Sequence, residues 1–224
     1  MHPKLSRAQI LSNLAVTPDC IGLEEQPSAS IEREKLQTVL TTQSSSNTEI
    51  DGIQSDDTRI LLALCTPLGL HLAHGLAYTV GSALGCVPPS VEECLVAFTT
   101  TNRVNLTAGA RAWSKHAHRS FFEKPPPPMG WWGTPSGPVA TINENALRLF
   151  WNIIGNASWR NLHWLPHSVL VYEVRVKMGY GMRWSQDRRD ADDGLDTDHP
   201  PWIFRGFVEP MMENGHEKGW RHAP

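Results

Sequence analysis

The sequence predicts an α+β fold, with N-terminal helices packed on a small C-terminal antiparallel β-meander. Apolar residues recur at helical spacing up to about residue 158, and after Trp159 they alternate with a period of two. Helices that are followed by strands along the chain are typical of this fold class.

The first 58 residues are expected to form a mostly disordered acidic arm, with short helices at 5–15 and 30–40. They contain four Lys and Arg against nine Asp and Glu, and the run TTQSSSNTEIDGIQSDD is polar throughout. Such a segment buries too little apolar area to offset the entropy lost on ordering. Residues 59–224 are then expected to form a single α+β domain.

Two capping motifs predict helix starts in this domain. In Ser90-Val-Glu-Glu93 and Thr141-Ile-Asn-Glu144, the hydroxyl can accept a hydrogen bond from the amide three residues on, while the Glu reaches back. We therefore expect helices within 59–120 and over 141–158.

The remaining elements are predicted from turn residues and alternation. Four consecutive prolines indicate a long loop over 123–138, anchored by Trp131 and Trp132. Apolar alternation and glycine turns predict strands within 168–210, with an acidic loop before the last strand. The tail, residues 211–224, is expected to dock on the domain through Trp220.

An uncharged stretch from Ile60 to Val91 raises the question of a membrane span. It contains Pro67, His71 and His74, and it lacks the aliphatic density and basic flanks of a bilayer helix. We expect buried helices and no membrane contact. Because no signal peptide opens the sequence, a cytoplasmic or nuclear location is expected.

No catalytic signature of a known kind is present: the phosphate-binding, dinucleotide-binding, serine-hydrolase and HExxH patterns are all missing from the sequence. The first candidate site is the meander, where alternation projects charged side chains onto one face. Such residues can hold an anionic substrate, or they can simply form cross-strand ion pairs. These residues are Glu173, Arg175, Arg183, Arg205 and Glu209.

The second candidate is a group of histidines, His163, His167, His216 and His222. No pair has a recognised metal-ligand spacing, so no metal or cofactor is predicted. One of them could act as a general base that Glu173 or Glu209 orients, and a hydrogen-bonded structural role is the alternative.

The third candidate is a basic helix within 102–120. Residues 100–183 hold ten basic against three acidic side chains, and Arg111, Lys115 and His118 share one stripe. No RNA- or DNA-binding motif accompanies the stripe, and the sequence pI is about 6.4. Nucleic acid is therefore not expected as a partner.

Several segments together resemble a small family of plant and fungal proteins for which no activity is established. They are RAWSKHAHRS, WRNLHWLPHSVLVYEVR, GYGMRW and GFVEPMMENGHEKGWRH, within about residues 104–222. The resemblance implies no catalytic residue, and it implies that the arm and the acidic loop are peripheral.

The function that these observations favour is binding of a small molecule or anionic ligand, with hydrolytic acid/base chemistry. Glu173, Glu209 and His216 are the predicted catalytic residues, and Arg183, His163 and His222 are the predicted substrate-binding residues. The alternative is a non-enzymatic module that holds a protein partner through the basic helix and the Trp and polyproline loop.

Overall fold

The computed structural model describes residues 5–42, 64, 66–117, 130–189 and 200–211. Within these ranges it has six α-helices and one four-stranded sheet, which confirms the α+β fold. The helices are α1 (Arg7–Ala15), α2 (Ser28–Thr42), α4 (Pro67–Ala73), α5 (Val91–Thr99), α6 (Ala108–His116) and α7 (Val139–Gly155). The strands are β1 (Ala157–Leu165), β2 (Val169–Val176), β3 (Gly181–Asp187) and β4 (Ile203–Val208).

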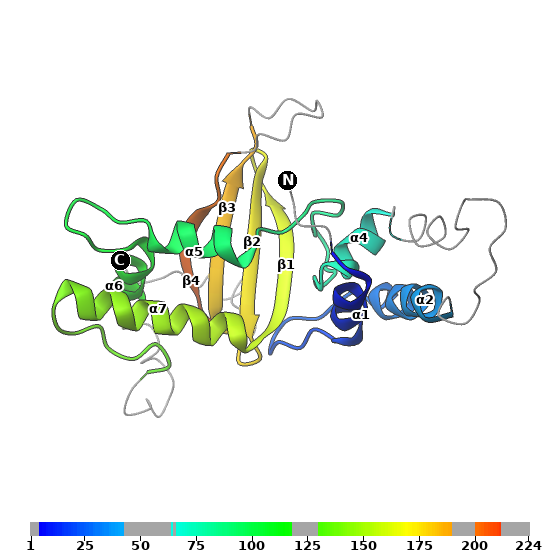
Figure 1. Cartoon of the computed structure of the whole chain (residues 1–224), viewed down its shortest axis with the longest axis horizontal. Helices are drawn as coiled ribbons and strands as arrows, with labels where there is room; N and C mark the ends of the chain where they lie inside the picture. Colours follow the sequence, from blue (N-terminus) through cyan, green and yellow to red (C-terminus); the bar gives the residue numbers. More distant parts are fainter. Residues whose placement is uncertain (1–4, 43–63, 65, 118–129, 190–199, 212–224) are drawn as a thin grey trace.

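The sheet is an antiparallel meander in the order β1-β2-β3-β4 (Figure 1). Strand β1 was not predicted, because residues up to 158 were assigned to a helix and strands were expected only from 168. The helix in fact ends at Gly155, and the segment after it pairs with β2 along its whole length.

Helices α5 and α7 lie over one face of the sheet, and α6 lies beside β4 (Figure 1). The side chains that the sheet turns towards them form the main core. Directly paired residues share a face, and one such row, Leu162, Tyr172, Trp184 and Phe204, is buried there. Phe98 of α5 packs between Phe204 and Phe150, with ring centroids 4.8 and 5.0 Å away.

One of the two predicted helix caps is correct. Ser90 and Glu93 form the expected reciprocal bonds at the start of α5, 3.1 and 2.8 Å long. Helix α7, however, begins at Val139, two residues before the expected cap at Thr141. Pro138 stands at its N-cap without a side-chain bond, because the proline ring carries no hydrogen-bond acceptor.

The short helices expected at 5–15 and 30–40 correspond to α1 and α2, which pack with α4 into a small helical lobe, here called the N-terminal lobe. Serine 6 caps α1 with Gln9 in a capping box, and the lobe has its own apolar core. The burial of these side chains supplies the stabilisation that the composition alone did not reveal. The core residues are Ile10, Leu14, Ala29, Leu36, Leu40, Leu72 and Ala73.

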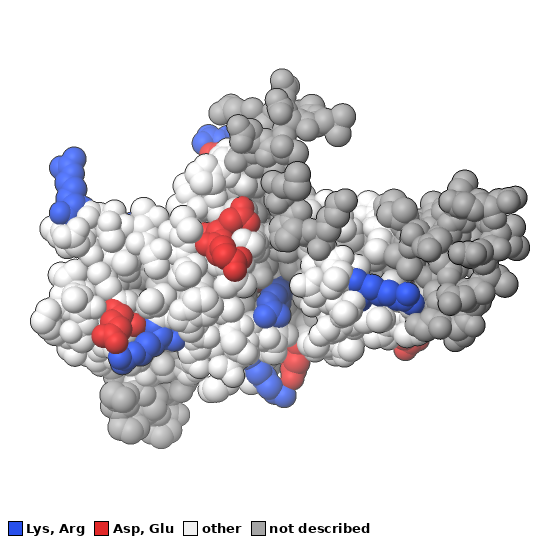
Figure 2. Space-filling model, viewed as in Figure 1, with Lys and Arg blue, Asp and Glu red and all other residues white. Residues whose placement is uncertain are grey.

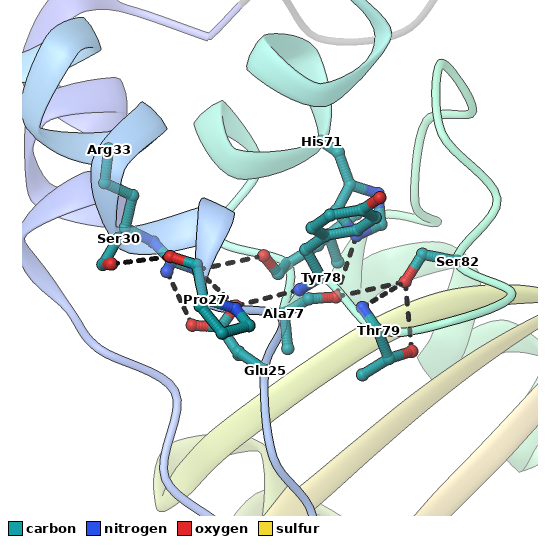
Figure 3. Close-up of polar contacts among 10 residues, drawn as sticks. Glu25, Pro27, Ser30, Arg33, His71, Ala77, Tyr78, Thr79 and Ser82 are labelled. Atoms are coloured by element: carbon teal, nitrogen blue, oxygen red, sulfur yellow. Dashed lines mark hydrogen bonds and ion pairs between the residues drawn. The ribbon is translucent and has the colours of Figure 1, made fainter.

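A buried ion pair fixes this lobe to the segment that borders β1 (Figure 3). The Arg33 guanidinium donates to both carboxylate oxygens of Glu25, at 2.6 and 2.8 Å, and Glu25 also accepts from the amide of Tyr78 at 2.9 Å. The adjoining chain then bonds to β1: Ala77 N donates to Arg160 O at 2.7 Å, and Ala83 N donates to Leu162 O at 2.8 Å. The segment therefore covers part of an edge that would otherwise present unpaired backbone groups.

Within the described ranges, no helix has both the length and the apolar character that crossing a membrane requires. The uncharged stretch holds only the short helix α4 there. Several predicted features lie outside the described residues: the arm at 43–58, most of the proline-rich loop, the acidic loop at 190–199 and the tail from 212 onward. For these the sequence-based expectations stay predictions.

Candidate active site on the charged face of the sheet

The sheet face opposite α5 and α7 carries the charged residues. We call it the charged face and define it by Glu173, Arg175 and Arg183. Glu173 on β2 pairs directly with Asn161 on β1 and with Arg183 on β3, and Arg183 pairs with Gly206 on β4. One row of paired residues, Asn161, Glu173, Arg183 and Gly206, thus crosses all four strands.

Glu173 lies at the centre of this face and holds both arginines. Its Oε1 accepts from Arg175 Nε at 2.6 Å, and its Oε2 accepts from Arg183 Nε at 2.8 Å and also from Nη2. Burial alone would raise the pKa of Glu173, but the two guanidinium groups overcome that effect and hold the pKa below its ordinary value. Glu173 is therefore a carboxylate at neutral pH, and it is better suited to positioning the arginines than to accepting a proton.

The two arginines differ in exposure, and the difference separates their roles. Only 3% of the Arg175 side chain is exposed, and its Nη1 donates to the main-chain oxygens of Gly179 and Glu209, at 2.6 and 2.7 Å. By contrast, 36% of the Arg183 side chain is exposed. Arg175 ties the end of β4 to the sheet, and Arg183 presents positive charge to solvent.

A histidine from α6 meets the carboxylate of Glu209 at the end of β4. His116 Nδ1 lies 3.0 Å from Glu209 Oε1, and both side chains are mostly buried, with 18% and 21% exposed. A carboxylate on one ring nitrogen orients an imidazole and fixes its tautomer. This is the arrangement that general acid/base chemistry requires.

Gly206 lies beside the His116 ring at the end of the charged row. Gly206 ends the row that contains Glu173 and Arg183, and a Cβ placed on it would lie 3.8 Å from Nε2 of His116. Its φ of 133° also favours glycine. The His116 and Glu209 pair is thus next to the charged row, and Arg175 joins the two through the Glu209 carbonyl oxygen.

His163 on β1 lies on the same face, because it is two residues after Asn161 and side chains alternate along a strand. It is half-buried, and its backbone pairs with that of Ser82. Burial lowers the pKa of His163, Glu173 partly offsets this, and the two arginines lower it further. The imidazole is therefore neutral at neutral pH.

Among the described residues, the helix-covered side of the molecule shows no comparable cluster of buried ion pairs. Figure 2 shows scattered basic and acidic groups there, several of them adjacent to a group of opposite sign. An example is Arg148 with Glu144 on α7, an exposed pair 2.5 Å apart. Exposed pairs of this kind contribute little and direct no ligand.

The predicted site residues have different outcomes. Glu173 and Arg183 are in contact, His163 lies on their face, and Glu209 joins them through Arg175. Arg205 was expected on the same face. It lies between Phe204 and Gly206, where the pairing of β4 with β3 shifts register, and it has no pairing partner in that ladder. The two predicted tail residues, His216 and His222, lie outside the described residues.

Sequence reasoning missed His116, the partner that Glu209 has in the structure. The predicted basic stripe of that helix used His118 instead, and His118 is outside the described residues. His116 and Glu209 are separated by 93 positions in the chain. Only the packing of α6 against β4 brings them together, so no local pattern could have found the pair.

In the described part of the chain, no group of three or more His, Cys, Asp or Glu side chains is arranged to hold a metal ion.

Comparison with known proteins adds one finding. Residues 98–191 match the family model of the CdiA C-terminal tRNase toxin domain. The match covers less than half of the chain: it runs from the end of α5 through β3, includes His116, Glu173 and Arg183, and leaves out β4 and the N-terminal lobe. No curated protein and no solved structure gives a significant match.

This match corrects the interpretation of function. It indicates a nuclease, so the predicted small-molecule or anionic-ligand pocket and the alternative protein-interaction module are both wrong. It also overturns the resemblance to a plant and fungal family without known activity. The expectation that nucleic acid is not a partner is wrong as well, because the family's substrate is RNA. The signal that was underweighted is the charge of the matched segment, which holds twelve Lys and Arg against five Asp and Glu.

Proposed function

We propose that this protein is a ribonuclease that cleaves tRNA, with its active centre where α6 meets the charged face. The observation that carries the proposal is the contact between His116 and Glu209, next to Gly206, the pairing partner of Arg183, in a chain whose segment 98–191 matches a tRNase toxin domain. The match supports RNA as the substrate, and the contact between His116 and Glu209 supports acid/base chemistry.

RNA can be cleaved through its own 2′-hydroxyl. The hydroxyl loses a proton and attacks the adjacent phosphorus, the bond to the 5′-oxygen breaks, and that oxygen takes up a proton. Imidazole suits this proton transfer because its ordinary pKa lies near neutrality. His116 would take the 2′-hydroxyl proton at Nε2, while Glu209 holds Nδ1 and stabilises the charged ring.

The phosphate gains negative charge as the new bond forms, and preorganised donors stabilise that charge. Arg183 is the group for this role because its guanidinium is partly exposed and Glu173 fixes its Nε and Nη2 edge. Glu173 is then a positioning residue. Arg111 and Lys115, both exposed on α6, add positive charge on the helix that carries His116 and contribute to phosphate attraction.

The proposal is tested by incubating the purified chain with tRNA and following the products on a denaturing gel. His116→Ala should lower the cleavage rate roughly 10²–10⁴-fold, as expected for loss of an acid/base residue. His167→Asn is the matched control, because His167 is exposed in the β1–β2 turn, where its φ of 64° suits asparagine. Cleavage that survives His116→Ala at the wild-type rate would remove His116 from the mechanism, and a wild-type chain that leaves tRNA intact would refute the proposal.

Glu209 has a separate test, since it acts through His116. Glu209→Gln should lower kcat more than it raises KM and should shift the pH profile of kcat, because the amide no longer stabilises a protonated ring. A residue that only supports the fold would not move the pH profile.

A further inference from the structure

A stack of two aromatic rings stands at the end of the sheet that also carries Glu209. The Trp131 ring lies on the Tyr180 ring with centroids 4.5 Å apart and planes within 6° of parallel. Trp132 meets both rings edge-on, at 4.6 and 5.2 Å. We call Trp131 and Tyr180 the aromatic stack.

The aromatic stack has an inner and an outer ring. Tyr180 is 3% exposed and Trp132 is 2% exposed, whereas Trp131 is only partly buried. The surface that the stack offers to a ligand therefore belongs to Trp131. Large aromatic rings are normally buried, and a partly exposed ring backed by a parallel one is suited to receive a third flat group.

The outer ring is held in place by the surrounding structure. Trp113 Nε1 of α6 donates to the main-chain oxygen of Trp132 at 2.7 Å, and Gly133 N closes the turn on Gly130 O at 2.8 Å. A preorganised ring loses little entropy when a ligand stacks on it.

The aromatic stack is close to the proposed active centre. The rings of Trp132 and Phe207 are 4.9 Å apart, and those of Phe207 and His116 are 6.3 Å apart. On the other side, Gly179 precedes Tyr180, and a Cβ placed on it would lie 2.8 Å from Cα of Pro210, which follows Glu209. A nucleotide next to the cleaved one could therefore place its base at Trp131.

We infer that Trp131 is a stacking platform for an unpaired base of the RNA, next to the phosphate that is cleaved. This deepens the proposed function and rests on it. A base inside a paired helix already stacks on its neighbours, so recognition by an aromatic ring selects bases that are splayed out of a loop or a single strand. The preferred cleavage site is accordingly at unpaired nucleotides of tRNA.

The experiment measures binding of a fluorescently labelled uridine oligonucleotide to the full-length His116→Ala chain, by anisotropy at a stated salt concentration. Adding Trp131→Leu keeps an apolar side chain against Tyr180 but removes the ring face. It should weaken binding roughly 5- to 150-fold, which corresponds to the usual contribution of one base–aromatic stack. Trp131→Phe should restore most of the loss, and a duplex of the same length should bind more weakly than the single strand.

Trp151→Ala is the matched control, because Trp151 is an exposed tryptophan on α7. It should leave binding unchanged, and melting curves of all variants show whether the fold persists. Equal binding by the Trp131→Leu and parent chains overturns the inference, as does an equal loss in Trp151→Ala or equal binding of the duplex.

The two proposals fail in different ways. If the wild-type chain cleaves tRNA while Trp131→Leu changes neither binding nor the choice of cleavage site, the stacking role is wrong and the ribonuclease proposal stands. If the wild-type chain does not cleave tRNA but Trp131 is required to bind the single strand, the ribonuclease proposal is wrong and the base platform stands.

Discussion

The two faces of the sheet are made by the same strands but differ in polarity and in what covers them. One row, Leu162, Tyr172, Trp184 and Phe204, is apolar and covered by helices, and the adjacent row is Asn161, Glu173, Arg183 and Gly206. Alternation along a strand places neighbouring residues on opposite faces. The apolar face is therefore stabilised by burial of aromatic and aliphatic side chains, whereas the charged face is stabilised by ion pairs around the buried Glu173 and Arg175.

The largest expected effect is on the apolar face. Trp184 is fully buried, and its Nε1 donates to the main-chain oxygen of Cys94 at 3.1 Å. Trp184→Ala should lower the free energy of unfolding by about 3–5 kcal/mol, because it leaves a cavity and an unpaired acceptor. Chemical denaturation followed by circular dichroism measures this loss. A loss below about 1 kcal/mol would show that this row is not the main core.

The next effect is at the centre of the charged face. Glu173→Gln leaves Arg175 buried without its carboxylate, which should cost about 3 kcal/mol. Arg183→Ala removes a partly exposed partner and should lower the free energy of unfolding clearly less. Unfolding curves of the two variants therefore separate the buried Glu173–Arg175 pair from the more exposed Arg183. Equal losses would contradict the division of roles between the two arginines.

Acid should weaken the ion pairs that Glu173 makes with the two arginines. Because the pKa of folded Glu173 lies below its ordinary value of 4.5, its contribution to stability is present above that value and is lost as the pH falls through the folded pKa. The stability difference between wild type and Glu173→Gln should thus be constant near neutral pH and shrink in acid. A difference that does not change with pH would show that the carboxylate is not the source of the stabilisation.

A smaller effect is expected at His163. Its pKa is lowered from 6.5, so the folded state favours the neutral ring, and stability should fall as the pH drops from about 6.5 through the folded pKa. His163→Gln should remove this part of the pH dependence. NMR titration of the ring checks the direction, and a midpoint above 6.5 would contradict the effect of burial and of the two arginines.

The parts of the site that could be predicted are those formed by neighbouring strands of the meander. Glu173 and Arg183 could be placed on one face because strand alternation and a short turn define their pairing. Strand β1 was not placed, since ASWRNLHWL follows the helix with no proline between them, and its alternation is interrupted by a register shift between Ala157 and Trp159. The two short N-terminal helices were predicted, but their packing with α4 was not, because it depends on contacts between segments that are distant in the sequence.

The proposed catalytic pair was beyond local reasoning for a different reason. His116 and Glu209 come from a helix and a strand end that are distant in sequence, and they meet through the buried contacts of Trp113, Trp132 and Phe207. The proposed mechanism uses one imidazole, one orienting carboxylate and a cation, and these residues need no fixed spacing in the chain. The net positive charge of the matched segment was the only sequence signal.

The central claim is that the charged face, and not the helix-covered side, acts on RNA. It is tested most directly by comparing two arginines, Arg183 on the charged face and Arg148 on α7, in single-turnover cleavage of tRNA by folded protein. Arg183→Ala should slow cleavage by roughly 10²–10³-fold, as expected for loss of a preorganised donor to developing charge, and Arg148→Ala should cleave at the wild-type rate. If Arg183→Ala retains the wild-type rate, or if Arg148→Ala loses as much, the charged face is not the active centre.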